Sequence, residues 1–457
     1  MSYTSAHILV YPFPASGHII PLLDLTRLLL TRGLTVTVLV SPSHLPLLQP
    51  LLSSHASVQP LVLSSAPEPP SSSSPQLSLP AKIRATAALY DPILQWFRSH
   101  PHPPVAIVSD FFLGWTHRLA TDLGVPRVAF WPSGAFAASI YNSLWRDLPK
   151  NDDPTDENFV ISFEGVPNSP KCPWWQITPH IRDPDGEFMR NGMLANFQSW
   201  GAVFNSFTEL ERVYIDHVKK VMGHKKVWAV GPLLPPTDDQ MGPANRGGSS
   251  AVPAHEVMTW LDGKRDESVV YVCFGSRVEL TSKQTEALAA ALERSEVHFI
   301  WCVQEHVAGR GDSIPEGFGK RVGERGFIVR GWAPQVAILS HRAVGVFVTH
   351  CGWNSVLEGV AAGVLMLTWP LGSDQFLDAN LLVDQLGLAV RACEGGVKNV
   401  PDLGELTRLL AESVSGKRLE RTRVKDMRKA AWNAVKGGSS TRDLNELVEK
   451  LSELSKK

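Results

Sequence analysis

The chain has 457 residues, which is too long for one ordinary hydrophobic core and suits two domains of about 200 residues each. Hydrophobic residues make up 44% and charged residues 19%, as in an ordinary globular protein. Because 44 Lys and Arg face 45 Asp and Glu, the formal net charge is −1, which excludes the strong basic bias of proteins that bind nucleic acid or anionic membranes.

No targeting or membrane segment is indicated. The N-terminal stretch lacks the basic start and cleavage pattern of a signal peptide, and Pro12, Pro14 and His18 interrupt its apolar run. The apolar run Val360–Leu371 is shorter than the roughly 20 residues of a membrane span. The five cysteines form no Cys-x-x-Cys pair, and no Asn-x-Ser/Thr site occurs, which favours a reducing compartment. We therefore expect a cytoplasmic monomer that spans no membrane.

The first half of the chain alternates strand and helix patterns. A short apolar run at His7–Tyr11 predicts a strand, and the leucine-rich stretch Pro21–Leu30 predicts a helix that ends before Gly33. Further buried strands are predicted at 34–40, 105–108 and 128–130. This alternation is typical of a doubly wound α/β domain with a parallel sheet.

The same alternation restarts after residues 231–252, a Pro-, Gly- and Ser-rich stretch that we interpret as an exposed linker. Strands are predicted beyond it at 269–274, 298–303, 327–329, 344–348 and 365–367. A Ser/Pro run at 67–80 predicts a surface loop, and an amphipathic pattern predicts a last helix at 441–454. The predicted domains are therefore 1–240 and 253–440, followed by a C-terminal segment, 441–457.

Parallel sheets bind ligands at the carboxyl ends of their strands, so a binding site is expected in the loops that follow the strands. The predicted strand 344–348 leads into Thr349-His350-Cys351-Gly352 and then a helix that Gly363 ends. A helix that starts directly after a strand offers free N–H groups to a diphosphate. His350, Asn354 and Ser355 add donors, and Glu358, one turn beyond Asn354, can accept from a ribose diol.

Two flanking segments fit the same kind of ligand. Trp332, held by the nearby Pro334, offers a flat ring on which a base can stack. Asp374 and Gln375 place an acceptor beside an amide, a combination that binds adjacent sugar hydroxyls. Taken alone, a tryptophan at a strand end is more often a core residue, and an Asp-Gln pair is usually part of a solvated loop. Only their order within one stretch favours a nucleotide sugar.

The 44 residues from Trp332 to Gln375 resemble the signature box of plant secondary-product UDP-glycosyltransferases, glycosyltransferase family 1. The resemblance extends to Gly17-His18, residues 205–211 (NSFTELE) and Phe274-Gly275-Ser276. It implies a GT-B fold, in which two Rossmann-like domains face a cleft and the last helix packs back on the N-terminal domain. It also implies UDP-sugar contacts from Ser276, Trp332, Ala333, Gln335, His350, Trp353, Asn354, Ser355, Glu358, Asp374 and Gln375.

The resemblance also implies a catalytic dyad in the first domain. His18 follows the first strand and Asp110 ends a later one, so both can meet at one edge of the sheet. By themselves, His18 could be structural and Asp110 a helix cap. In the family, matching residues are the base that deprotonates the acceptor hydroxyl and the aspartate that orients it. We expect acceptor contacts from Phe13, Phe112, Trp131, Trp174 and Trp175.

The predicted reaction is an inverting O-glycosylation of a flavonoid or other small phenolic. No His/Cys cluster indicates a metal, and no cofactor is expected beyond the UDP-sugar co-substrate. Gln375 favours UDP-glucose, whereas Pro132, where many members have threonine, offers no hydrogen bond to a C6 hydroxyl and leaves UDP-rhamnose or UDP-xylose as alternatives. Leu365 and Arg277 also depart from the family pattern.

Two other classes of protein compete with this interpretation. A nicotinamide oxidoreductase would carry Gly-x-Gly-x-x-Gly after the first strand, and that motif is absent. A non-catalytic nucleotide-sugar binder would carry the same donor box, and only His18 and Asp110 distinguish it from an enzyme.

Overall fold

The computed structural model describes residues 5–64, 77–149, 153, 156, 159–177, 183–235, 252–276, 279–303, 314–415 and 418–456. The chain divides into two compact units, one formed by 1–234 with 433–457 and the other by 235–432. Residues 67–76 of the predicted surface loop, 236–251 of the predicted linker, and Arg277 lie outside the described residues.

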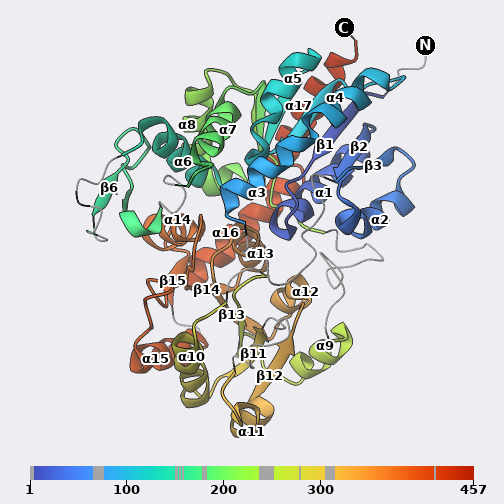
Figure 1. Ribbon diagram of the computed structural model, residues 1–457. Coiled ribbons are helices and arrows are strands. Elements are labelled where there is room, and N and C mark those ends of the chain that lie inside the picture. The colour runs from blue at the N-terminus through green and yellow to red at the C-terminus, as the bar shows by residue number, and fades with distance from the viewer. Residues whose placement is uncertain are drawn as a thin grey trace. The chain divides into compact units, whose positions relative to one another are not determined.

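The first unit is built on a seven-stranded parallel sheet (Figure 1). Its strands run in the order β3-β2-β1-β4-β5-β8-β9. They span β1 His7–Tyr11, β2 Thr35–Val40, β3 Val58–Val62, β4 Ala106–Asp110, β5 Arg127–Trp131, β8 Gly201–Phe204 and β9 Val227–Ala229. Buried β-branched and aromatic residues dominate β1, β2, β4 and β5, as expected for strands covered by helices on both faces.

The helices of the first unit alternate with these strands. They are α1 Ser16–Leu30, α2 Leu45–Ser54, α3 Leu79–Thr86, α4 Tyr90–Ser99, α5 Thr116–Leu123, α6 Ala135–Asp147, α7 Gly186–Phe197 and α8 Thr208–Met222. A short antiparallel pair, β6 Val160–Ser162 and β7 Lys171–Pro173, lies outside the main sheet. Helix α1 begins five residues before the predicted start at Pro21, so His18 lies in its first turn.

The last helix, α17 Ser439–Leu454, packs in the first unit, where Figure 1 shows it in red among blue and green elements. Its Leu444, Leu447 and Leu451 belong to the same hydrophobic core as β1 and β2. Asp443 Oδ2 accepts from Ala229 N at 2.8 Å, which ties the helix to β9. The sequence predicted that the C-terminal segment begins at residue 441. In the structure, the chain returns to the first unit at Asn433, within the long helix α16 Leu419–Val435.

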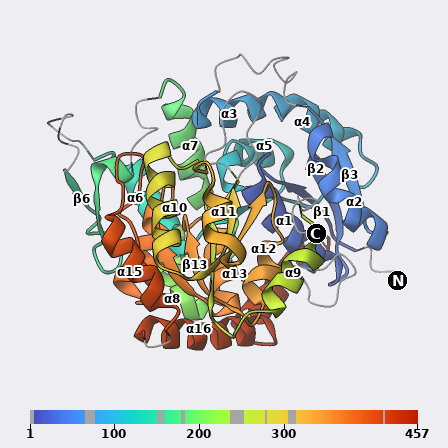
Figure 2. The ribbon, with the colours of Figure 1, turned by 90° about the horizontal axis from the view of Figure 1, so that it is seen from below.

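The second unit contains a six-stranded parallel sheet in the order β12-β11-β10-β13-β14-β15. The strands span β10 Val269–Cys273, β11 His298–Val303, β12 Gly326–Arg330, β13 Val344–Thr349, β14 Leu365–Thr368 and β15 Ala389–Arg391. Besides α16, the helices are α9 Ala254–Asp262, α10 Ser282–Arg294, α11 Phe318–Val322, α12 Gln335–Ser340, α13 Trp353–Ala362, α14 Gln375–Asn380 and α15 Leu403–Ser413. Figure 2 shows α10 and α15 side by side in this unit.

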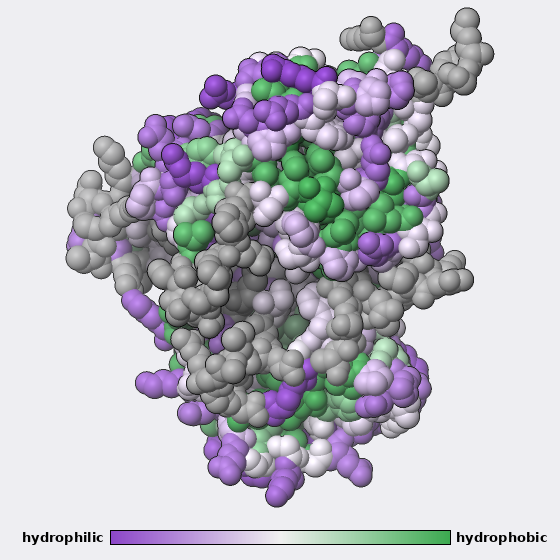
Figure 3. All heavy atoms as spheres, turned by 45° about the vertical axis from the view of Figure 1, so that its right-hand side comes forward, coloured by the Kyte–Doolittle hydropathy of each residue, from purple (hydrophilic) through white to green (hydrophobic). Residues whose placement is uncertain are grey.

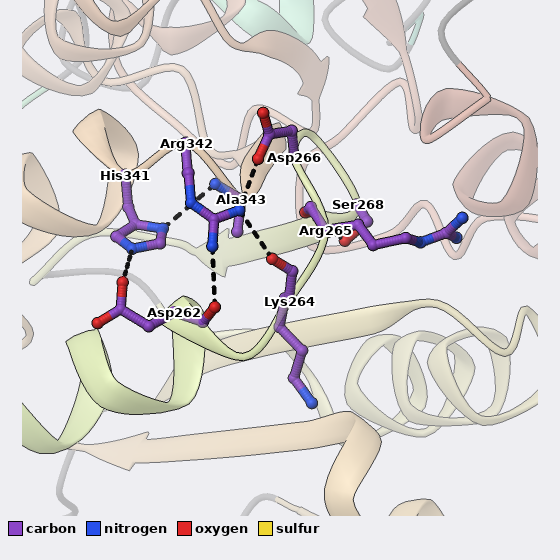
Figure 4. A network of polar contacts seen from close by, with 8 residues as sticks. All are labelled: Asp262, Lys264, Arg265, Asp266, Ser268, His341, Arg342 and Ala343. Carbon is purple, nitrogen blue, oxygen red and sulfur yellow. Dashed lines mark hydrogen bonds and ion pairs between the residues drawn. The ribbon is translucent and has the colours of Figure 1, made fainter.

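Polar contacts hold together the amino ends of β10 and β13 (Figure 4). Arg342 donates to the main-chain oxygens of Asp262 and Lys264 at 2.8 and 3.0 Å, and to Asp266 Oδ1 at 2.5 Å. His341 Nε2 lies 3.1 Å from Asp262 Oδ1. These bonds fasten the loop before β10 to the turn before β13, at the edge of the sheet opposite the strand ends that bear the predicted donor box.

On the face drawn in Figure 3, hydrophilic and apolar residues lie next to one another. Within the described residues, no helix is long and apolar enough to cross a membrane.

Candidate active site

The first candidate site lies at the carboxyl ends of β1 and β4, which are neighbours in the first sheet. His18 projects from the first turn of α1, and Asp110 is the last residue of β4. His18 Nδ1 lies 2.8 Å from Asp110 Oδ2, while Asp110 Oδ1 accepts from Phe112 N at 2.9 Å. Because an ionised carboxylate only accepts, Nδ1 carries the proton and Nε2 keeps its lone pair.

The two side chains differ sharply in exposure. The Asp110 side chain is fully buried, whereas that of His18 is 12% exposed. Phe112 stacks on the imidazole with ring centroids 4.8 Å apart, and Phe13 packs edge-on at 5.4 Å. These contacts and the Asp110 bond restrict the imidazole to one orientation. The site thus presents one oriented nitrogen base, the arrangement that general-base catalysis requires.

The predicted acceptor residues fall into different environments. Phe13 is 2% exposed and Phe112 is half-buried, and both touch His18. Trp131 is 1% exposed and stacks between Phe111 and Phe204 with centroids 4.4 and 5.8 Å away. The structure therefore places Trp131 in the core and not at an acceptor surface, because β5 turns its side chain inward.

Trp174 and Trp175 form a short 3₁₀ turn directly after β7, and both are half-buried. The turn is held to the β6–β7 pair by Trp174 N, which donates to Phe159 O at 2.7 Å. Their position on this small hairpin leaves both indoles with exposed surface.

The second candidate site lies at the carboxyl ends of the strands of the second unit. Helix α13 starts at Trp353 directly after β13, and Gly363 in the left-handed region ends it, as predicted. The indole of Trp353 is 3% exposed, and its main chain forms the first residue of the helix, so its predicted sugar contact stays a prediction. Asn354 and Ser355 follow within the first turn of the helix.

His350 occupies a narrow slot beside that helix start. A Cβ at Gly275 would lie 2.6 Å from His350 Nε2, and one at Gly352 would lie 2.5 Å away, so both positions require glycine. Burial lowers the pKa of His350 to about 4, and the imidazole is therefore neutral near pH 7. Its Nδ1 is buried without a hydrogen-bond partner among the described residues. Ser276, after Gly275, is exposed.

Gln335 joins three elements of the second site. Its Nε2 donates to Glu358 Oε2 at 2.6 Å and lies 3.1 Å from Ser355 Oγ. Its Oε1 accepts from Tyr271 OH at 3.1 Å. The structure therefore brings together Gln335 and Glu358, for which the family resemblance implies contacts to a ribose. Tyr271 was not predicted, because only the register of β10 beside β13 reveals its place.

The remaining donor-box residues lie at neighbouring strand ends. Trp332 is half-buried and Ala333 is 8% exposed, both between β12 and α12. Gln375 Oε1 accepts from Leu371 N and Gly372 N at 2.9 and 3.0 Å, which identifies its other terminal atom as the donating Nε2. Asp374 precedes α14 and is half-buried. No group of three or more metal-ligating side chains occurs among the described residues.

Each of the two α/β units is built on a parallel sheet. One unit carries a histidine–carboxylate dyad, and the other carries a helix start beside polar strand ends. These features are typical of the GT-B class of transferases. The family model of UDP-glucoronosyl and UDP-glucosyl transferases matches residues 232–396. UDP-glycosyltransferase 89B2 of Stevia rebaudiana is 51% identical over 98% of each chain. Flavonol 3-O-glucosyltransferase UGT89B1 of Arabidopsis thaliana is 50% identical, covering 98% of this chain and 96% of that protein.

Solved structures agree with the sequence relatives. The crystal structure of Arabidopsis thaliana UGT89C1 complexed with UDP-L-rhamnose has a TM-score of 0.81 and 37% identity, covering 98% of this chain and 100% of that chain. The same protein complexed with quercetin has a TM-score of 0.78. The chain belongs to the plant UDP-glycosyltransferases of glycosyltransferase family 1 and is an enzyme of that class.

Proposed function

We propose that this transferase moves glucose from UDP-glucose to a hydroxyl group of a flavonoid or similar small phenolic and inverts the anomeric centre. The 2.8 Å contact between His18 and Asp110 carries the proposal. A non-catalytic nucleotide-sugar binder would have no use for a histidine whose ring is oriented by a fully buried carboxylate and whose second nitrogen keeps its lone pair.

His18 Nε2 removes the proton of the acceptor hydroxyl as the acceptor oxygen attacks C1 of the sugar. The new C1–O bond forms while the bond from C1 to the phosphate oxygen breaks, and UDP leaves with the electron pair. Asp110 stabilises the imidazolium that results and keeps Nδ1 protonated throughout. A single displacement of this kind converts an α-linked donor into a β-glycoside.

The second unit supplies the donor contacts in this proposal. Trp332 and Ala333 hold the uracil, and Gln335 with Glu358 holds the ribose. The start of α13 with His350, Asn354, Ser355 and Ser276 receives the diphosphate, since its N–H groups and dipole favour negative charge. Asp374 and the donating amide of Gln375 bind the sugar hydroxyls.

The N–H groups at the start of α13 stabilise the charge on the leaving diphosphate, a role that a divalent ion has in other transferases. The proposed reaction therefore needs no divalent ion. The proposal also includes a cytoplasmic location, which the five free cysteines support. It further includes a monomeric enzyme, since one chain carries all the residues assigned above.

The flavonoid acceptor follows from chemistry and relatives together. His18 lies among aromatic rings, with Phe13 and Phe112 in direct contact, and flat phenolics pack well against such rings. UGT89B1 is named a flavonol 3-O-glucosyltransferase, and UGT89C1 binds quercetin. Trp174 and Trp175 are proposed to extend the acceptor surface.

Transfer of rhamnose or xylose is the alternative. Pro132 is buried directly after β5 and has no N–H to offer a C6 hydroxyl, and the related UGT89C1 binds UDP-L-rhamnose. This alternative keeps the same acceptor class and the same base.

The decisive experiment incubates the purified chain with quercetin and a panel of simple phenolics, each with UDP-glucose, UDP-rhamnose or UDP-xylose. Mass spectrometry identifies the products, with and without excess chelator after removal of bound metals. We expect glucosides as the main products and full activity with chelator. No product from any donor, or activity that only Mg²⁺ or Mn²⁺ restores, would contradict the proposal.

A further inference from the structure

Arg127, the first residue of β5, is a buried cation with no part in the reaction described above. It is 2% exposed. Its Nε donates to Ser109 Oγ and Thr116 Oγ1, both at 2.8 Å, and one terminal nitrogen donates to Ser199 Oγ at 2.8 Å. The other terminal nitrogen lies 3.3 Å from the main-chain oxygen of Asp110. All four acceptors are uncharged, so they hold the guanidinium in place without neutralising it.

A buried charge among uncharged partners is costly unless an opposite charge lies close by. Asp110 provides that charge, because its carboxylate is fully buried and, among the residues that the structure describes, its two oxygens contact only His18 and the N–H of Phe112. Burial lowers the pKa of Arg127 to about 9, and the negative charge of Asp110 acts in the opposite direction. Arg127 therefore stays protonated near pH 7 and balances Asp110.

We propose that Arg127 is a positioning residue for the catalytic base. Through the Asp110 carbonyl it fixes the turn that carries the carboxylate, and its positive charge balances the carboxylate that orients His18. The inference rests on the proposed role of His18 as the base.

The titratable groups around this cluster come from several elements. They are His18 on α1, Tyr11 on β1, His117 on α5, Arg127 on β5, and His224, whose Nε2 lies 3.3 Å from Ser199 O. Burial raises the pKa of Tyr11 and lowers the pKa of His117, so neither carries a charge near pH 7. Loss of the positive charge of Arg127 would therefore make the His18–Asp110 pair take up a proton at a higher pH.

The test measures the pH dependence of kcat/KM with UDP-glucose and quercetin for the unaltered enzyme, Arg127→Met and Arg127→Lys. A protonated base cannot accept the proton of the acceptor hydroxyl, so kcat/KM falls at low pH. This fall is the acid limb of the pH profile. We expect this acid limb to move up by about one pH unit in Arg127→Met and to stay in place in Arg127→Lys, which keeps the charge. An unmoved limb in Arg127→Met, or an equal shift in both variants, overturns the inference.

Arg421→Met is the matched control. Arg421 is 4% exposed and pairs with Glu267 at 3.0 Å in the second unit, so its loss removes a buried arginine far along the chain from the base. We expect lower stability but an unmoved acid limb. A shift of the limb in this variant equal to that in Arg127→Met would show that the limb reports general damage, which also overturns the inference.

If Arg127→Met does not purify as a folded protein, the double variant Asp110→Asn/Arg127→Met decides the question. It removes both buried charges, so we expect it to fold and to melt at a higher temperature than Asp110→Asn alone. A double variant that melts below Asp110→Asn overturns the charge balance. Failure of the proposed function is recognised separately, by normal turnover in His18→Ala.

Discussion

Gln335 and Glu358 are 23 residues apart in the chain, yet the amide of one donates to the carboxylate of the other at 2.6 Å. The contact joins the first residue of α12 to the middle of α13. Glu358 is 8% exposed, so its carboxylate is held in one orientation before any ligand arrives. In the proposed function this carboxylate accepts from the ribose diol.

Glu358→Gln therefore tests the ribose assignment. The amide keeps the size of the side chain but loses the charge, and hydrogen bonds to a charged group contribute about 1.5–3 kcal/mol. We expect KM for UDP-glucose to rise about 10- to 150-fold, with a much smaller change in kcat. Glu412→Gln, at an exposed ion pair with Arg408, is the control. An unchanged KM in Glu358→Gln would remove Glu358 from the donor site.

Gly275→Ala tests the slot that holds His350. The added methyl would meet His350 Nε2 at 2.6 Å, and the φ of +77° at this position disfavours any side chain. We expect UDP affinity, measured by calorimetry, to fall at least about tenfold. Gly323→Ala is the matched control, because Gly323 also has a positive φ, +55°, and a Cβ there meets nothing within 4 Å. Equal loss in both variants would mean that the slot has no special role.

The pKa of His350 predicts how stability depends on pH. Burial lowers this pKa to about 4 in the folded state, against 6.5 for an unperturbed histidine. Between these values the unfolded chain binds a proton that the folded chain does not, so the contribution of His350 is full above about pH 6.5 and is lost as the pH falls towards 4. We expect the difference in urea midpoint between pH 7 and pH 5 to be smaller in His350→Gln than in the unaltered protein. An equal difference would show that His350 does not remain neutral.

Donor choice is tested at Pro132. Threonine at this position restores a hydroxyl that can bond to the C6 hydroxyl of glucose, and one neutral hydrogen bond contributes about 0.5–1.5 kcal/mol. We expect the unaltered enzyme to use mainly UDP-glucose with some UDP-rhamnose or UDP-xylose when the three compete at equal concentration. Pro132→Thr should shift this ratio towards glucose by up to about tenfold. Strict use of glucose by both proteins would refute this role of Pro132.

Much of the fold could be predicted from the pattern of apolar runs. The strand at His7–Tyr11 and the one at His298–Val303 have the predicted bounds, as does helix Trp353–Ala362. The short strands Gly201–Phe204 and Val227–Ala229 were missed, because three or four apolar residues without alternation do not distinguish a strand from a loop.

The approach of His18 to Asp110 was predictable, since two strand ends of one parallel sheet lie at the same edge. The burial of Trp131 was not, because an aromatic residue at a strand end can face either the core or a pocket, and only the packing of Phe111 and Phe204 decides between them. The surroundings of Arg127 could not be predicted either, because its hydrogen-bond acceptors meet only in the folded chain. Its four uncharged acceptors come from three separate segments of the chain, since Ser109 and Asp110 are both on β4.

The most direct test of the proposed mechanism compares turnover and UDP binding in His18→Ala. Loss of a general base lowers kcat by about 10²- to 10⁴-fold, whereas the proposed UDP contacts lie in the second unit and are unchanged. We therefore expect product formation from UDP-glucose and quercetin to fall by that factor while the calorimetric Kd for UDP stays within about twofold of the unaltered value. Near-normal turnover in His18→Ala would contradict the assignment of His18 as the catalytic base.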